Sequence, residues 1–154
     1  MDPADNSSRP DLEAVRRRRT TLRVSAERLE EALAAASADR TGPSCADILS
    51  AARELRSCLL AHIEATEGPN GFHAEMLTAA PRLAHDIDIL VREHAQLSTV
   101  ATDLASRSGP DCTVEEMEAI RQTGTRLVTA IGRHLQRGSD LIYEAFESEI
   151  GGET

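Results

Sequence analysis

The sequence predicts an all-α protein that folds as an antiparallel up-down four-helix bundle. Its composition is typical of helices: alanine and leucine are abundant, with many Glu and Arg, and the chain has two Phe, one Tyr and no Trp. Runs of β-branched and aromatic residues, which strands need, are nearly absent. Apolar residues recur at helical spacing between short breaker segments. The 154 residues suffice for one domain with a core, and helices joined by short connections become antiparallel neighbours.

The breakers divide the chain into a tail and a bundle. We expect residues 1–10 to form a disordered tail and residues 11–152 to form the bundle. The first helix is expected from about Asp11 to about Ala38, where the DRTGPS segment ends it. A second should begin between Ser44 and Asp47 and stop at the GPNG turn. Its inward stripe is Ile48, Ala51, Ala52, Leu55, Cys58, Leu59 and His62.

The second half of the chain holds the most regular apolar stripes. A short helical turn is expected over 72–79, and Pro81 suits the first turn of the third long helix, where its missing N–H costs nothing. Thr113 and Glu116 form a capping box that starts the last helix, which should finish at the Gly151–Gly152 pair. The two stripes are Leu83, Ile87, Leu90, His94, Leu97, Ala101 and Leu104, then Ile120, Leu127, Ile131, His134, Leu141 and Ala145.

Charge and cysteine content narrow the class of protein. A net charge of −9 argues against general nucleic-acid binding, which needs excess Lys and Arg. No run approaches the ~18 apolar residues of a membrane span, and the polar, acidic start is unlike a signal peptide. We therefore expect a cytoplasmic protein, neither membrane-bound nor bound to nucleic acid. Cys45, Cys58 and Cys112 lack a CxxC pairing and are expected as free thiols, with Cys58 a small buried hydrophobe.

The first helix carries a basic patch on an otherwise acidic chain, formed by Arg16 to Arg19 with Arg23 and Arg28. Two interpretations stay open. These arginines form a solvated face that pairs with nearby Glu, or they form a docking surface for an acidic partner.

The histidines carry the strongest functional signal. Helical spacing places His62, His94 and His134 on the inward stripes of three different helices. His85 lies nine residues before His94, on the opposite face at about 100° per residue, and His73 follows the GPNG turn, so both are expected at the surface. A buried imidazole needs a polar partner for at least one nitrogen. Three together predict a bound metal or a shared, metal-free polar network.

Carboxylates near these histidines are imperfectly placed for ligation. The candidate carboxylate ligands closest to the inward face are Glu67, Asp140 and Glu144. Glu93 is less suitable, because it lies about 100° round the helix from His94. The i+4 positions, which lie directly beside a histidine, hold Thr66 and Gly138.

Each of the last three long helices carries a segment that combines a histidine with acidic residues. The segments read His62-Ile-Glu-Ala-Thr-Glu67, Arg92-Glu93-His94-Ala-Gln-Leu97 and Arg133-His134-Leu-Gln-Arg-Gly-Ser-Asp140-Leu-Ile-Tyr143-Glu144. In this order the segments resemble those of hemerythrin-like (HHE cation-binding) domains, and the resemblance covers roughly residues 55–152. It implies a non-haem iron site inside the bundle, usually di-iron, that binds dioxygen, senses oxygen or redox state, or handles nitric oxide or peroxide.

The chain departs from that family in its ligands. Its first helix has no histidine, the i+4 glutamates are replaced by Thr66 and Gly138, and no second histidine lies four residues from His94. The resemblance therefore implies a reduced site with one or two iron ions. Its ligands would come from His62, Glu67, His94, His134, Asp140 and Glu144.

We expect this site to bind dioxygen or a related diatomic ligand rather than to turn over a substrate. No nucleophile–base pattern or phosphate-binding loop is present, so any catalysis would have to come from the metal. The alternative is a metal-free helical interaction module that binds a partner or forms a homodimer.

Overall fold

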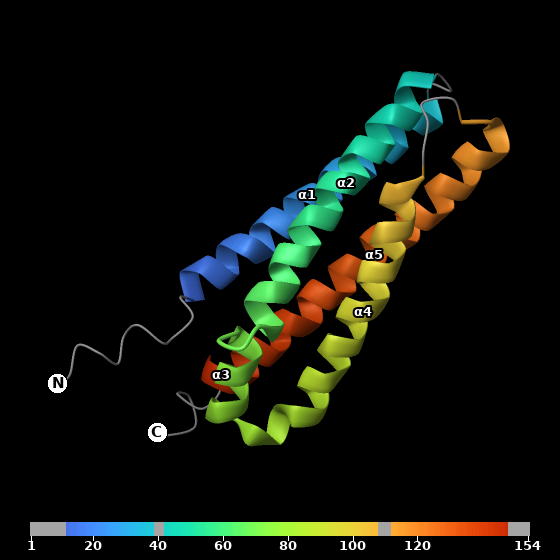
Figure 1. Cartoon of the computed structure of the whole chain (residues 1–154). Helices are drawn as coiled ribbons and strands as arrows, with labels where there is room; N and C mark the ends of the chain where they lie inside the picture. The colour runs from blue at the N-terminus through green and yellow to red at the C-terminus, as the bar shows by residue number, and fades with distance from the viewer. Residues whose placement is uncertain (1–11, 39–41, 108–111, 148–154) are drawn as a thin grey trace.

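The computed structural model describes residues 12–38, 42–107 and 112–147, and these are all-α with no strand among them (Figure 1). Its long helices are α1 (Leu12–Ala38), α2 (Gly42–Glu67), α4 (Ala84–Ser106) and α5 (Val114–Ile142). The short α3 (Phe72–Ala79), a 3₁₀ turn (Pro81–Leu83) and a π-helical turn (Tyr143–Glu147) complete the described chain. The expected tail 1–10 and the expected helix end at Gly151–Gly152 lie outside the described residues.

The helix boundaries follow the local signals closely. The Thr113 hydroxyl accepts from the Glu116 N–H, and the Glu116 carboxylate accepts from the Thr113 N–H, so the predicted capping box is confirmed. Pro81 begins a 3₁₀ turn that leads into α4. Helix α2 starts at Gly42, slightly earlier than expected. None of the described helices is long and apolar enough to cross a membrane.

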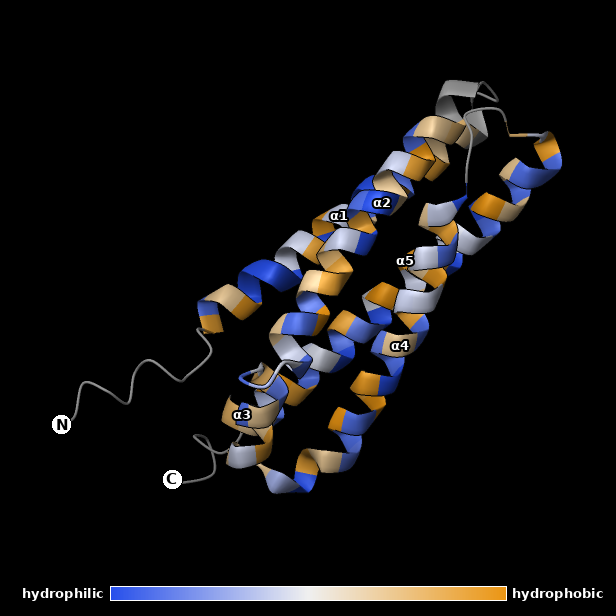
Figure 2. Cartoon of the chain, viewed as in Figure 1, coloured by the Kyte–Doolittle hydropathy of each residue, from blue (hydrophilic) through white to orange (hydrophobic). Residues whose placement is uncertain are grey.

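The four long helices pack as a bundle in which each contacts two others. Helix α1 packs against α2 and α5, and α4 packs against the same two. Hydrophobic and hydrophilic residues alternate along each helix as amphipathic packing requires (Figure 2). All residues of the two predicted stripes of α4 and α5 are buried.

The core consists of two apolar clusters with a polar layer between them. The larger cluster fills most of the bundle; the smaller surrounds α3 and includes Phe72, Met76 and Leu90. Helices α1, α4 and α5 each pass from one cluster to the other at a buried polar residue, which is Arg19, His94 or His134. His62 is the buried polar residue near the end of α2. The sequence of each helix therefore places one polar side chain at about the same level of the bundle.

A disulfide joins Cys45 to Cys112, so the expectation that these cysteines are free thiols is wrong. The starts of α2 and α5 lie at the same end of the bundle (Figure 1), where the Cα atoms of the two cysteines are 6.3 Å apart, within the range a disulfide spans. Cys58 is a free thiol and is half-buried rather than fully buried.

Removal of this disulfide should destabilise the protein strongly. It closes a loop of 67 residues, for which chain entropy gives a loss of about 4 kcal/mol in the free energy of unfolding. We expect this loss for a Cys45→Ser/Cys112→Ser variant in urea denaturation under non-reducing conditions. Cys58→Ser is the matched control and should change little. Equal midpoints for wild type and double variant would contradict the prediction.

Candidate metal centre

Three histidine side chains from three helices meet inside the polar layer. His62 of α2, His94 of α4 and His134 of α5 each offer a ring nitrogen, and these nitrogens lie within 4.8 Å of one another. The rings are buried, with exposed fractions of 3%, 1% and 3%. The centroids of the His94 and His134 rings are 4.6 Å apart. The predicted inward positions of the three histidines are therefore confirmed, and the structure shows in addition that their side chains converge.

Two carboxylates hold the outer nitrogens of this cluster. His94 Nδ1 lies 2.7 Å from Glu67 Oε2, and His134 Nδ1 lies 3.1 Å from Glu93 Oε1. Because a carboxylate only accepts, each neutral imidazole carries its proton on Nδ1 and has a lone pair on Nε2. Metal-ligating histidines are commonly oriented in this way by an outer carboxylate.

The inner nitrogens have few partners in the protein. His94 Nε2 and His62 Nδ1 are buried without a hydrogen-bond partner in the described part of the chain. His134 Nε2 lies 3.4 Å from His62 Nε2. Two imidazole nitrogens at zinc-like bond lengths in a tetrahedral site are about 3.3 Å apart. The spacing of this pair and the unpaired lone pair of His94 therefore both fit a shared cation.

Burial keeps the cluster in its ligand form. It lowers the pKa of His62 to about 2, with repulsion from His94 and His134 adding to the effect. Burial also lowers the pKa of His134 to about 4, although Glu93 opposes the shift. The pKa of His94 is lowered because burial outweighs the contribution of Glu67. Metal binding requires neutral imidazole, which these shifts secure at neutral pH.

Only some of the carboxylates near the three histidines in sequence lie near them in the structure. Glu67 reaches the cluster but contacts the outer nitrogen of His94. Glu93, which the helical angle to His94 does not favour as a ligand, contacts His134 on the neighbouring helix instead. Asp140 and Glu144 are exposed, and Asp140 accepts a hydrogen bond from Gln136. The structure does not bring these last two residues to the cluster.

His73 is buried, so its expected surface position is wrong. Helix α3 packs against the end of α2 and places the His73 ring parallel to that of His94, with centroids 5.7 Å apart. Burial lowers the pKa of His73 to about 4. His85 is exposed, as the spacing predicts.

The comparisons with known proteins do not identify a family for this chain. Neither the models of protein families, nor the curated proteins, nor the solved structures give a match.

Arg19 is also a member of the polar layer, although the sequence predicts it as part of the basic patch. Its side chain is buried and donates from Nη2 to the carbonyl of Leu135 (2.6 Å) and to Ser139 Oγ (2.5 Å). The helical spacing could have predicted this burial, because Arg19 lies on the same face of α1 as the buried residues Val15, Leu22, Ala26, Leu29 and Leu33. The neighbouring arginines Arg16, Arg17 and Arg18 are exposed, as a surface patch requires.

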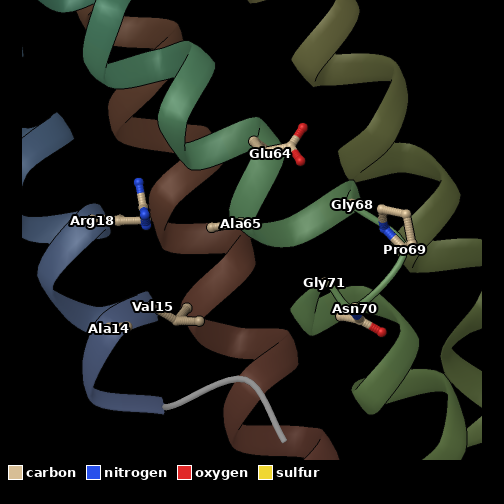
Figure 3. Close-up of a pocket in the computed structure, with 9 residues that line it drawn as sticks. All are labelled: Ala14, Val15, Arg18, Glu64, Ala65, Gly68, Pro69, Asn70 and Gly71. Atoms are coloured by element: carbon tan, nitrogen blue, oxygen red, sulfur yellow. The ribbon is translucent and has the colours of Figure 1, made fainter. Parts of the chain in front are cut away.

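Two hollows lie at this end of the bundle. A cavity of about 20 Å³ is lined by Arg19 and the buried histidines. A larger crevice of about 290 Å³ lies between the start of α1, the end of α2 and the turn at 68–71 (Figure 3). Val15 lines both.

Loss of an outer carboxylate should weaken metal binding without removing a ligand. Glu67→Gln leaves an amide beside His94 Nδ1 and removes the negative charge that orients the ring, so we expect affinity for Co²⁺ to fall about 10–100-fold. Competition with a chromophoric chelator measures the change. Glu64→Gln is the control, because Glu64 is exposed on the same helix and lies outside the cluster. Equal affinities for Glu67→Gln and wild type would show that Glu67 has no such role.

Proposed function

We propose that the chain is a hemerythrin-like protein that holds one transition-metal ion between His62, His94 and His134. The supporting observation is the convergence of three buried, neutral imidazoles whose outer nitrogens are fixed by carboxylates. In this proposal the helices form an antiparallel up-down bundle, as in the family that the sequence resembles. The ligands come from three of the four long helices, because the first helix has no histidine.

The carboxylates favour one ion over two. A di-iron site needs carboxylates that bridge the metals from inside the bundle. Here Glu67 and Glu93 are engaged with the outer nitrogens of His94 and His134, and Glu93 also pairs with Arg137 at 3.2 Å. No further carboxylate joins the three histidines within the described residues.

Imidazole ligands suit iron, zinc and copper. We propose non-haem iron because of the resemblance, with zinc as the alternative. An iron ion would supply redox chemistry and affinity for dioxygen or a related diatomic ligand. The protein would supply three neutral ligands, exclude water by burial and leave room for little more than one small molecule. We therefore propose binding or sensing of oxygen or redox state rather than turnover.

Metal analysis tests the proposal directly. Protein purified from iron-supplemented medium should contain one iron per chain by plasma mass spectrometry, and its visible spectrum should respond to dioxygen. Stoichiometric zinc in place of iron would retain the site and overturn the oxygen-binding function. Less than about a tenth of an equivalent of iron, zinc or cobalt per chain after reconstitution would contradict the proposed metal site, since a ligand set of this kind binds tightly. That result would favour the metal-free interaction module.

A further inference from the structure

We propose that α1 and α5 form the interface of an antiparallel homodimer, in which the basic half of each α1 lies against the acidic half of the other. This inference goes beyond the proposed function and does not depend on the metal. Three features support it: the division of charge along α1, the lack of partners for these charges among the described residues, and a crevice between α1 and α5.

Charge is divided between the two halves of α1. From residue 16 to residue 23 every charged side chain is an arginine. From residue 27 to residue 31 the charged side chains are Glu27, Glu30 and Glu31, with Arg28 as the exception. Arg28 is already paired with Glu54 of α2 at 2.6 Å. The exposed apolar side chain of Val24 lies at the boundary between the two halves.

The charges on the α5 side of α1 are not neutralised by the described part of the chain. Arg16, Arg23, Glu27 and Glu30 are exposed and form no ion pair among the described residues. Burial lowers the pKa of the Arg19 guanidinium, and repulsion from Arg23 adds to this effect. A carboxylate from outside the chain that lies against Arg23 would offset this repulsion.

A crevice of about 530 Å³ lies between α1 and α5, next to these charges. Glu27 and Glu30 line it from α1, whereas every residue that lines it from α5 is uncharged. Gly132 leaves it open, because a Cβ built there would meet nothing within 4 Å. The buried residues Ile131 and Leu135 also line it. An arginine that enters this crevice covers apolar surface with its stem and meets carboxylates with its guanidinium.

A second copy of the chain satisfies both halves of α1 at once. In an antiparallel pair with a twofold axis near residue 25, Arg23 lies opposite Glu27 of the second copy, and Arg16 lies toward its Glu30. A twofold axis repeats both contacts. An acidic protein, a nucleic acid or an anionic membrane would fit the basic half but would meet like charge at the acidic half. The pattern therefore favours self-association.

The size of this face is sufficient for a dimer. The 27 residues of α1 and the 29 of α5 give helices about 40 Å long at ~1.5 Å per residue. Two such helices, each about 10 Å wide, present about 800 Å², the usual contribution of one partner. Exposed ion pairs contribute little each, and the net charge of −9 per chain opposes association. We therefore expect a weak dimer whose orientation is set by charge.

Charge reversal on the full-length protein tests the proposal, with sedimentation equilibrium at low ionic strength as the measurement. Arg16→Glu/Arg23→Glu and Glu27→Arg/Glu30→Arg should each raise the dimer dissociation constant at least about tenfold, because each places like charges opposite one another. An equimolar mixture of the two variants should form a heterodimer, because one chain is then acidic at all four positions and the other is basic. The variant with all four changes should recover the homodimer.

Arg126→Glu/Arg133→Glu is the matched control. Both residues are exposed on α5 and lie outside the crevice, and the variant has the same net charge as Arg16→Glu/Arg23→Glu. It should dimerise nearly like wild type. All the replaced residues are exposed, so the variants should fold, which circular dichroism checks. Cobalt binding should be unchanged in every variant, because none of these residues belongs to the histidine cluster.

The other outcomes overturn the inference and leave the metal site untouched. A wild type that stays monomeric up to millimolar concentration contradicts it. If this monomer binds polyglutamate and Arg16→Glu/Arg23→Glu does not, the basic half serves an acidic partner instead. Weak dimers for both double variants without a heterodimer in the mixture would exclude the antiparallel pairing. An equal loss of affinity in the control would assign the effect to net charge alone.

Discussion

Replacement of His94 by Ala should abolish stoichiometric metal binding. His94 supplies a buried nitrogen that has no hydrogen-bond partner among the described residues, and its other nitrogen is oriented by Glu67. Loss of a direct ligand should weaken affinity more than about 100-fold, the upper end for loss of an outer partner. The metal should also raise the melting temperature of wild type, because it binds the folded state, and the variant should lose this increase.

His85→Ala provides the matched control for this experiment. His85 lies on the same helix but is exposed and outside the cluster, so its replacement should leave metal content and melting temperature unchanged. The triple variant with alanine at positions 62, 94 and 134 should bind no metal. If this triple variant retained all its metal, the ion would have to bind elsewhere and the site assignment would be wrong.

The stability of the metal-free protein should fall steeply as the pH drops below about 6.5. The pKa values of His62, His73 and His134 are lowered from 6.5 to about 2, 4 and 4, mainly by burial. Between these values and 6.5 the unfolded chain binds protons that the folded chain does not. Each such histidine lowers the free energy of unfolding by up to about 1.4 kcal/mol per pH unit. This stability is present above pH 6.5 and is lost as the pH falls.

Urea denaturation of the metal-free protein at pH 7, 6 and 5 measures this slope. His62→Leu should reduce it, because the variant no longer carries a histidine that must stay neutral when buried. It should also raise stability at pH 5, provided that leucine fits the space of the imidazole. His85→Gln should retain the wild-type slope. A flat profile between pH 7 and 5, where few ordinary carboxylates titrate, would contradict the burial of neutral imidazoles.

The polar layer has a cost in stability that a bound cation would remove. Leucine or isoleucine at the same positions would join the two apolar clusters into one continuous core. Instead, the metal-free chain buries nitrogens that have no hydrogen-bond partner in its described part, which is costly. A bound cation would remove that cost, so the arrangement favours a protein whose folded state is completed by its ligand.

Much of the fold could be predicted from local features. The capping box of Thr113, the short helix over 72–79 and the buried stripes of α4 and α5 all follow from spacing and turn chemistry. The inward positions of His62, His94 and His134 follow in the same way, since the helical period assigns each to an apolar face. The Cys45–Cys112 disulfide could not be predicted, because its partners lie far apart in sequence and meet only where two helix starts coincide.

The sequence by itself determined which helices form and which side chains of the long helices lie on their apolar faces, because both depend on the period and ends of one helix at a time. It did not determine the burial of His73, which depends on how the short α3 packs. Only the tertiary structure decided how those side chains pair. It placed the three histidines at one level, set Glu93 beside His134 rather than its neighbour His94, and brought Arg19 into the space left by Gly138. These pairings depend on the axial offset and rotation of each helix against its neighbours, and interlocking side chains along the whole bundle set both.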